Sequence, residues 1–148
     1  MDTIVFSHEY FMREALKLAQ IAFAEGEIPV GAVIVANNVI ISKAYNQTEL
    51  LNDVTAHAEM LAYTAASNYL GSKYLLDCTL YTTLEPCVMC AAAGNRTQIS
   101  RIVFGAYDNK KGFSTVSSNI FNPKTEIIGG VLHDECKSLL DEFFKSKR

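Results

Sequence analysis

The amino-acid sequence predicts an α/β fold, with a three-layer α/β/α arrangement around a mixed five-stranded sheet. Segments with helical periodicity alternate along the chain with short segments rich in strand-forming residues. One pair of expected strands is joined by a tight hairpin and another by a helical crossover, so the sheet should contain antiparallel and parallel pairs. The chain has 148 residues, 49% of them hydrophobic, and a chain of this length buries about 70% of its unfolded surface. We therefore expect residues 1–148 to form a single domain.

The first expected element is a helix that begins after Ser7 and stops at Gly26. A serine at this position can cap the free backbone N–H groups of a helix start. Phe6 and Phe11 stand at the two positions of a hydrophobic staple around it. Apolar residues then recur at helical spacing and predict a packed face: Phe11, Met12, Ala15, Leu16, Leu18, Ala19, Ala22 and Phe23.

Two strands and a second helix are expected next. Residues 30–35 and 39–44 read as strands joined by Asn37-Asn38, a pair that tolerates the positive φ of a tight hairpin. After Asn46 comes a loop over residues 47–54. A helix should follow from about Ala56 to Leu70, with Asp53 or Thr55 as its cap and Gly71 at its end.

The second half of the chain supplies the remaining strands. A strand over residues 79–84 leads directly into a cysteine motif at its carboxyl end, where open α/β sheets place their ligands. The strand over residues 101–105 is reached through a short helix and should run parallel to it. Residues 108–124 are polar, and residues 126–130 form a possible fifth strand. A final helix carries an apolar face: Leu132, Cys136, Leu139, Leu140, Phe143 and Phe144.

The cysteine motif is the strongest chemical signal in the chain. Cys87 and Cys90 are three residues apart, the spacing at which one helical turn aims two thiols at a single ion. Pro86 suits a helix start, because its missing N–H would have no intrahelical partner there. A helix N-terminus also favours the thiolate form that metals require.

A third ligand and a carboxylate are expected from His57 and Glu59. One imidazole and two thiolates leave the fourth position of a tetrahedral zinc open for water, which is typical of a catalytic site. Glu59 can serve as the carboxylate that reaches this water without being a ligand. On a regular helix the side chains at i and i+2 point to different sides. We expect both residues in the first turn of the helix. Their spacing does not determine where the Glu59 side chain points, because that depends on the tertiary structure.

Composition narrows the classes of function. The net charge is −3 and the pI is near 5.6, whereas nucleic-acid-binding domains are usually strongly basic, so any RNA contact must come from local patches. The chain shows neither a signal peptide nor an apolar run long enough to span a membrane. We expect a cytoplasmic protein, with Cys78 and Cys136 as buried core thiols rather than disulfide partners.

The two halves of the motif together, H-x-E followed about 30 residues later by P-C-x-x-C, are known from zinc-dependent nucleobase deaminases. With these pieces in place, the chain resembles the bacterial tRNA adenosine deaminases of the cytidine deaminase-like superfamily. The resemblance runs nearly from end to end and is carried by FSHEYFMREAL, EIPVGAVIV, DVTAHAEM, CTLYTTLEPCVMC, RIVFGAYD and LHDECKSLLDEFF.

The resemblance implies a role for each motif residue. His57, Cys87 and Cys90 match the ligands of one zinc ion, and Glu59 matches the proton shuttle. Asn46 matches an asparagine that hydrogen-bonds the target base, although an asparagine here can also simply cap a turn. The implied reaction is hydrolytic deamination of the wobble adenosine in a tRNA anticodon loop, by attack of zinc-bound hydroxide at C6 to form inosine. The family also implies a homodimer.

One segment departs from the family pattern, and other functions stay open. Relatives usually carry apolar residues where this chain has residues 91–97, and Gly94 costs a helix about 1 kcal/mol, so the helix should be short or end there.

The main alternative is a free nucleobase or nucleoside deaminase of the guanine or cytosine type with the same zinc chemistry. Another is a non-catalytic module that uses zinc as a structural staple and takes a fourth ligand such as Cys78 or Cys136. Glu85 and Asp108 have no assigned role. Lys110 and Lys111 either contact phosphates or are solvated.

Overall fold

The computed structural model describes residues 6–147 and contains one mixed sheet. Its strand order is β2-β1-β3-β4-β5. Strand β1 runs antiparallel to β2 and β3, whereas β3, β4 and β5 are parallel. The strands are β1 (Gly31–Ala36), β2 (Val39–Tyr45), β3 (Cys78–Leu84), β4 (Arg101–Ala106) and β5 (Glu126–Ile128). The predicted mixed five-stranded sheet is confirmed.

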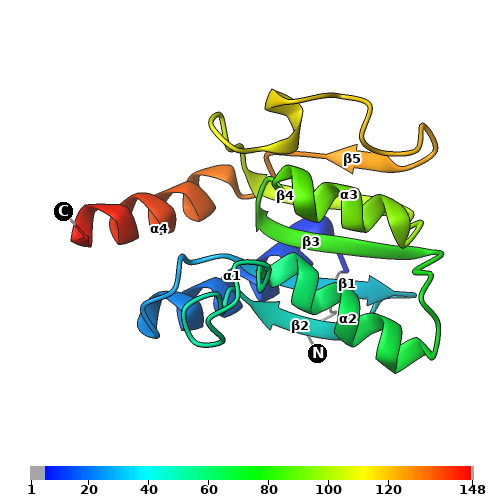
Figure 1. Ribbon diagram of the computed structural model, residues 1–148, viewed down its shortest axis with the longest axis horizontal. Coiled ribbons are helices and arrows are strands. Elements are labelled where there is room, and N and C mark those ends of the chain that lie inside the picture. Colours follow the sequence, from blue (N-terminus) through cyan, green and yellow to red (C-terminus); the bar gives the residue numbers. More distant parts are fainter. Residues whose placement is uncertain (1–5, 148) are drawn as a thin grey trace, which may run out of the picture.

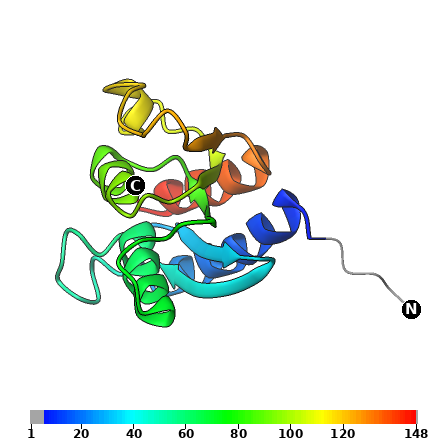
Figure 2. The ribbon, with the colours of Figure 1, turned by 90° about the vertical axis from the view of Figure 1, so that its right-hand side faces the viewer.

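Helices cover both faces of this sheet and give the three layers (Figure 1). Helices α1 and α4 lie on one face, and α2 and α3 lie on the other (Figure 2). The helices are α1 (His8–Ala24), α2 (Ala58–Leu70), α3 (Val88–Arg96), α4 (His133–Ser146) and the short 3-10 helix η1 (Phe113–Thr115). Within residues 6–147, no helix combines the length and the apolar character that crossing a membrane requires.

Several local signals are confirmed. The side chain of Ser7 accepts a hydrogen bond from the N–H of Tyr10 at the start of α1. The rings of Phe6 and Phe11 stack with their centroids 5.9 Å apart, as a hydrophobic staple requires. Asn37 and Asn38 both adopt positive φ, 51° and 62°, and form the turn between β1 and β2.

Two helix starts differ from the prediction. Helix α2 begins at Ala58, and its cap residue is His57. Asp53 does not cap the helix, because its carboxylate instead accepts hydrogen bonds from the backbone N–H and the hydroxyl of Thr55. Helix α3 begins at Val88 with Cys87 as its cap residue, so Pro86 lies before the helix rather than in its first position. His57 and Cys87 are expected from the sequence inside these helices, but both have extended backbone and stand just ahead of the first helical residue.

Helix α3 is short, as expected, with 9 residues, but it does not end at Gly94. The helix continues through Gly94 to Arg96, and the glycine serves close packing against α2. A Cβ at this position would lie 2.5 Å from the hydroxyl oxygen of Tyr63. That hydroxyl is buried and donates to the carbonyl of Cys90 at 3.1 Å. Gly94 therefore allows α2 and α3 to approach each other beside the cysteine motif.

We predict that Gly94→Ala destabilises the protein although alanine is the better helix former. The gain in helix propensity is about 1 kcal/mol, but forcing a methyl group against a buried, hydrogen-bonded ring costs about 1–3 kcal/mol. A net loss of about 1 kcal/mol lowers the Tm of a domain of this size by about 3 °C, measurable by circular dichroism. In a Tyr63→Phe background the same substitution should cost clearly less, because the hydroxyl is gone. An equal loss in both backgrounds would contradict this explanation.

Candidate metal centre

The fold brings three metal-ligating side chains together at the carboxyl end of β3. The ligand atoms of His57, Cys87 and Cys90 all lie within 4.8 Å of one another. The Nδ1 of His57 is 3.7 Å from the Sγ of Cys87 and 3.5 Å from the Sγ of Cys90. His57 and Cys87 are the cap residues of α2 and α3, and Cys90 lies in the first turn of α3. The predicted set of residues is thus assembled from two helix starts.

The donor set fits one zinc ion per chain. In a tetrahedral site with Zn–S and Zn–N bonds of about 2.3 and 2.05 Å, an imidazole nitrogen and a thiolate sulfur lie about 3.6 Å apart. The two observed separations, 3.5 and 3.7 Å, match this value. Cys78 and Cys136 are free and buried but do not belong to the cluster. In the described part of the chain, no other group of three or more histidine, cysteine, aspartate or glutamate side chains is placed to hold a metal.

The two sulfurs stand in contrasting electrostatic settings. The hydrogen bond from the Cys90 thiol, helped by the neighbouring His57, lowers the pKa of Cys87 to about 4. The same sulfur–sulfur hydrogen bond, together with burial, raises the pKa of Cys90. Contact with Cys87 also raises the pKa of His57, against the opposing effect of burial. Because zinc is bound by thiolates, its binding to Cys90, whose pKa is raised, releases a proton.

Glu59 lies beside the cluster without belonging to it. Its side chain is 4% exposed, and burial raises its pKa to about 7. A hydrogen bond with the Cys90 thiol and the positive potential of His57 act in the opposite direction. The extended backbone of His57, with φ −71° and ψ 152°, explains how side chains two residues apart face one site. Helical geometry begins only after His57, so the i, i+2 rule for helices does not apply to this pair.

Asn46 follows β2 and lies close in structure to the start of α2. The N–H of its neighbour Gln47 donates to the carbonyl of Ala56 at 3.0 Å, next to His57. The Asn46 side chain is 5% exposed, and its Oδ1 has no hydrogen-bond partner. An unpaired buried acceptor costs about 1–3 kcal/mol. Within the described residues this oxygen therefore caps no turn.

Two further buried acids were not assigned a task from the sequence. Glu27 is 2% exposed and accepts hydrogen bonds from the backbone N–H groups of Glu49 and Leu50, at 3.0 and 2.8 Å. Glu85 is 3% exposed and accepts from Asp108 and Ser114. Glu85 directly precedes a proline and Glu27 stands two residues before one, in the apolar contexts Leu-Glu-Pro and Glu-Ile-Pro, a signal that could have indicated burial. Each acid holds a loop that is distant in sequence.

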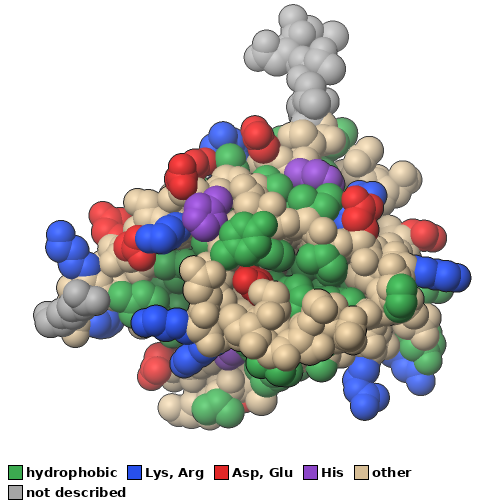
Figure 3. All heavy atoms as spheres, turned by 90° about the horizontal axis from the view of Figure 1, so that it is seen from above, with side chains coloured by type: hydrophobic (Ala, Val, Ile, Leu, Met, Phe, Trp, Pro, Cys, Tyr) green, Lys and Arg blue, Asp and Glu red, His purple; other side chains and the backbone are tan. Residues whose placement is uncertain are grey.

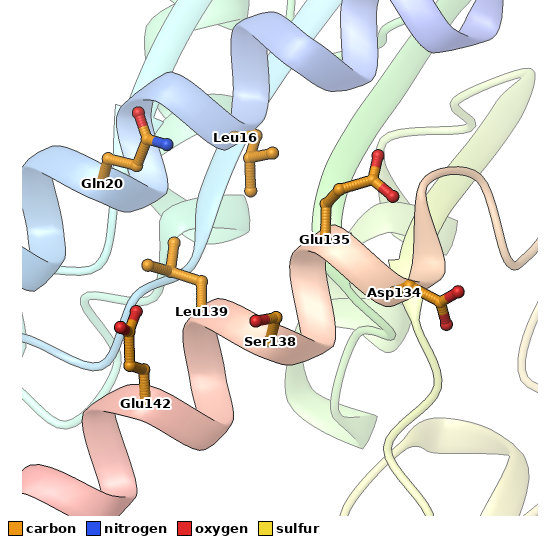
Figure 4. Close-up of a pocket in the computed structure, with 7 residues that line it drawn as sticks. All are labelled: Leu16, Gln20, Asp134, Glu135, Ser138, Leu139 and Glu142. Carbon is orange, nitrogen blue, oxygen red and sulfur yellow. The ribbon is translucent and has the colours of Figure 1, made fainter.

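The face shown in Figure 3 and one groove elsewhere on the surface offer little to a polyanion. Lysine and arginine side chains are scattered over the face in Figure 3 and do not form one continuous basic patch. Helices α1 and α4 cover the face of the sheet opposite α2 and α3 (Figure 2). An open groove lies between these two helices (Figure 4). Asp134, Glu135 and Glu142 line it together with Leu16 and Leu139. This acidic groove repels phosphate groups and shares no residue with the metal cluster.

Comparisons with known proteins agree with this geometry. Residues 6–106 match the family model of the cytidine and deoxycytidylate deaminase zinc-binding region. The fold and the donor set together define a zinc-dependent deaminase, and the chain belongs to this family.

Individual relatives narrow the assignment. A tRNA-specific adenosine deaminase from Aquifex aeolicus is 46% identical over 145 residues, which cover 95% of each chain. A solved structure from work on A-to-I editing by tRNA:A34 deaminases at the wobble position of transfer RNA has a TM-score of 0.83 at 38% identity and covers 88% of this chain and 99% of that chain. The structure of a guanine deaminase from Bacillus subtilis has a TM-score of 0.69 at 35% identity, and the match covers 79% of this chain and 78% of that chain. Within the zinc-dependent class, the chain belongs with the tRNA-specific adenosine deaminases.

We predict that metal analysis finds one zinc per chain and that the cluster residues control it. Removal of a ligand, as in His57→Ala or Cys90→Ala, should reduce zinc content far below one per chain, because two remaining side chains hold the ion poorly. Cys136→Ala is the matched control, since this buried thiol lies outside the cluster. Full zinc in Cys90→Ala, or loss of zinc in Cys136→Ala, would contradict the ligand set.

Proposed function

We propose that this protein is a hydrolase that converts adenosine to inosine at the wobble position of a tRNA, with water as co-substrate and ammonia as the second product. The observation that carries the proposal is the three-donor cluster of His57, Cys87 and Cys90 with a buried acid beside it and no fourth protein ligand among residues 6–147. This arrangement leaves room for water and substrate, as a hydrolytic zinc site requires. The likeness to tRNA-specific adenosine deaminases supports the choice of substrate.

The chain supplies the proton transfers that this reaction needs. Bound zinc lowers the pKa of water to about 7 and so makes hydroxide available at neutral pH. Glu59 accepts the proton released from water, delivers it to N1 of the adenine ring, and assists the departure of ammonia from C6. A group that takes and returns a proton works best when its pKa lies near the working pH, and burial brings the pKa of Glu59 to about 7.

Asn46 recognises the target base in this proposal. Its Oδ1 is buried and unpaired, so a ligand that donates a hydrogen bond recovers the free energy that the empty acceptor costs. An amide can donate and accept at neighbouring atoms of an adenine edge. A base in an anticodon loop can be splayed out of its stack into such a pocket, whereas a base inside a duplex must first be extruded.

The runner-up is a deaminase of free guanine or cytosine. One observation favours it: the likeness to a guanine deaminase at 35% identity, in a protein with net charge −3. The tRNA enzymes are favoured because their likeness is higher and extends over more of the chain. A non-catalytic zinc module lacks support, because a closed structural site needs a fourth ligand and the cluster holds three.

Three further properties belong to the proposal. Residues 1–148 act as a single domain, the protein works in the cytoplasm where tRNA is used, and two copies associate as a homodimer. The family likeness supports the homodimer. Light scattering on the purified protein tests it directly, since a monomer at working concentration would contradict it.

The decisive experiment is incubation of the zinc-loaded protein with a tRNA that carries adenosine at the wobble position, followed by sequencing for inosine. Activity on tRNA should fall steeply with salt, because phosphate contacts release counterions on binding. Turnover of free guanine or cytosine that is insensitive to salt, without inosine in tRNA, supports the runner-up instead.

We predict that Glu59→Gln abolishes turnover while zinc and tRNA are still bound. A glutamine keeps the shape of the side chain but cannot carry a proton between water and the ring, and loss of such a group costs about 10²–10⁴-fold in rate. Single-turnover kinetics, metal analysis and a tRNA binding assay give the three readouts. Retained turnover in Glu59→Gln would remove this residue from the mechanism.

We predict that Asn46→Ala separates activity from stability. The change removes a buried acceptor that has no partner in the protein, so the free energy of unfolding should change by no more than about 1 kcal/mol. Loss of the contact with the base should lower kcat/KM by about 10–100-fold. A destabilised protein with unchanged kcat/KM would indicate a structural role for Asn46 instead.

A further inference from the structure

Glu85 is a buried acid beside the cysteine motif that takes no part in the metal cluster. We propose that it is a positioning residue: it holds residues 108–114, here called the lysine loop, against the cysteine motif. It thereby sets Lys110 and Lys111 in place to contact phosphate groups of the RNA next to the target base. The inference rests on the proposed function, since a free base offers these lysines no phosphate.

Both carboxylate oxygens of Glu85 are used on the lysine loop. Oε1 accepts a hydrogen bond from the backbone N–H of Asp108 at 3.2 Å. Oε2 accepts from the N–H of Ser114 at 3.1 Å and from its hydroxyl at 2.6 Å. Hydrogen bonds to a charged acceptor are stronger than those to a neutral one. One side chain therefore fastens both ends of the loop.

The lysine loop is also paired with the cysteine motif through the backbone. Gly112 forms an isolated antiparallel bridge with Cys87, and the N–H of Phe113 donates to the carbonyl of Pro86 at 2.9 Å. A Cβ at Gly112 would lie 2.4 Å from the Cδ of Glu85, so a glycine is needed for this approach. The loop, Glu85 and Cys87 form one packed unit at the edge of the metal centre.

The geometry of the loop leaves its two lysines free for an external anion. The Oδ1 of Asp108 accepts the backbone N–H groups of Lys110 and Lys111, at 3.1 and 3.0 Å. Both lysine side chains are exposed, and neither forms an ion pair with any residue in the range 6–147. They are adjacent cations beside the metal centre of a protein whose net charge is −3. Asp108, the acid nearest to them in sequence, forms hydrogen bonds with their backbone N–H groups and no ion pair with their side chains.

Glu27 offers a matched control for this argument. It too is a buried acid that accepts two backbone N–H groups from a loop, residues 47–54. That loop contains no lysine or arginine. Loss of Glu27 should therefore cost stability in the same way, but it should leave the number of phosphate contacts unchanged.

The test is single-turnover deamination of a wobble-adenosine tRNA by excess zinc-loaded enzyme at several salt concentrations. The enzyme concentration at half-saturation reports binding, and the maximal rate reports chemistry. In Glu85→Gln an amide NH₂ replaces one acceptor oxygen and faces N–H donors, so the loop is released. We expect unchanged zinc content, a nearly unchanged maximal rate, and an enzyme concentration at half-saturation that is about tenfold higher. The salt slope, which is the slope of the logarithm of affinity against the logarithm of salt concentration, should fall in magnitude by about 1.4. Each of the two lost phosphate contacts with a single strand contributes about 0.7 to this slope.

Three companion variants make the result decisive. Glu27→Gln should keep the wild-type salt slope, whereas Ser114→Ala, which removes one donor to Glu85, should shift it slightly in the same direction as Glu85→Gln. The double substitution Lys110→Gln/Lys111→Gln should reduce the slope as much as Glu85→Gln, and combining all three changes should reduce it no further. If Glu85→Gln does not fold, the same cycle is measured with Ser114→Ala.

The outcomes that overturn the inference differ from those that overturn the function. A wild-type salt slope in Glu85→Gln, or a further reduction when the lysine substitutions are added to it, shows that Glu85 does not act through the lysines. Wild-type enzyme that makes no inosine in tRNA overturns the proposed function, and this inference with it.

Discussion

The separation of α2 and α3 is the constraint on which the metal centre depends. His57 comes from the start of one helix, and both cysteines come from the start of the other. The helices meet where Gly94 faces the Tyr63 hydroxyl, which donates to the carbonyl of Cys90. This contact places a cysteine of α3 with respect to the helix that carries His57. Because donor atoms about 3.6 Å apart tolerate little displacement in a tetrahedral site, packing one turn away bears directly on metal binding.

Glu27, Glu59 and Glu85 are three buried glutamates whose hydrogen-bond partners differ. Glu27 and Glu85 are saturated by backbone N–H groups and fix two loops. In Glu59, burial outweighs a backbone hydrogen bond and the positive potential of His57 and raises the pKa to about 7. The same functional group thus anchors a loop where loop N–H groups surround it, as in Glu27 and Glu85.

Local chemistry explains which parts of this structure could be predicted from the sequence. The turn at Asn37-Asn38, the helix end at Gly71 and the cysteine motif depend on residues close together in the chain, and they were found correctly. The extended backbone of His57 depends on how α2 meets the strands, and Gly94 depends on Tyr63 in another helix. The roles of Glu27 and Glu85 depend on loops more than 20 residues away. The sequence pattern around each acid did not identify these partners.

The two helix starts at the metal centre also shape the electric field that an approaching substrate meets. Each helix N-terminus carries a partial charge of about +0.5, and both are directed at one spot in a protein whose overall charge is −3. At physiological ionic strength such a field decays within about 8 Å. A polyanion therefore feels mild repulsion at long range and attraction only at the mouth of the site. The rate of encounter then depends on shape and diffusion. Electrostatic attraction acts on the RNA loop only after that loop has reached the mouth of the site.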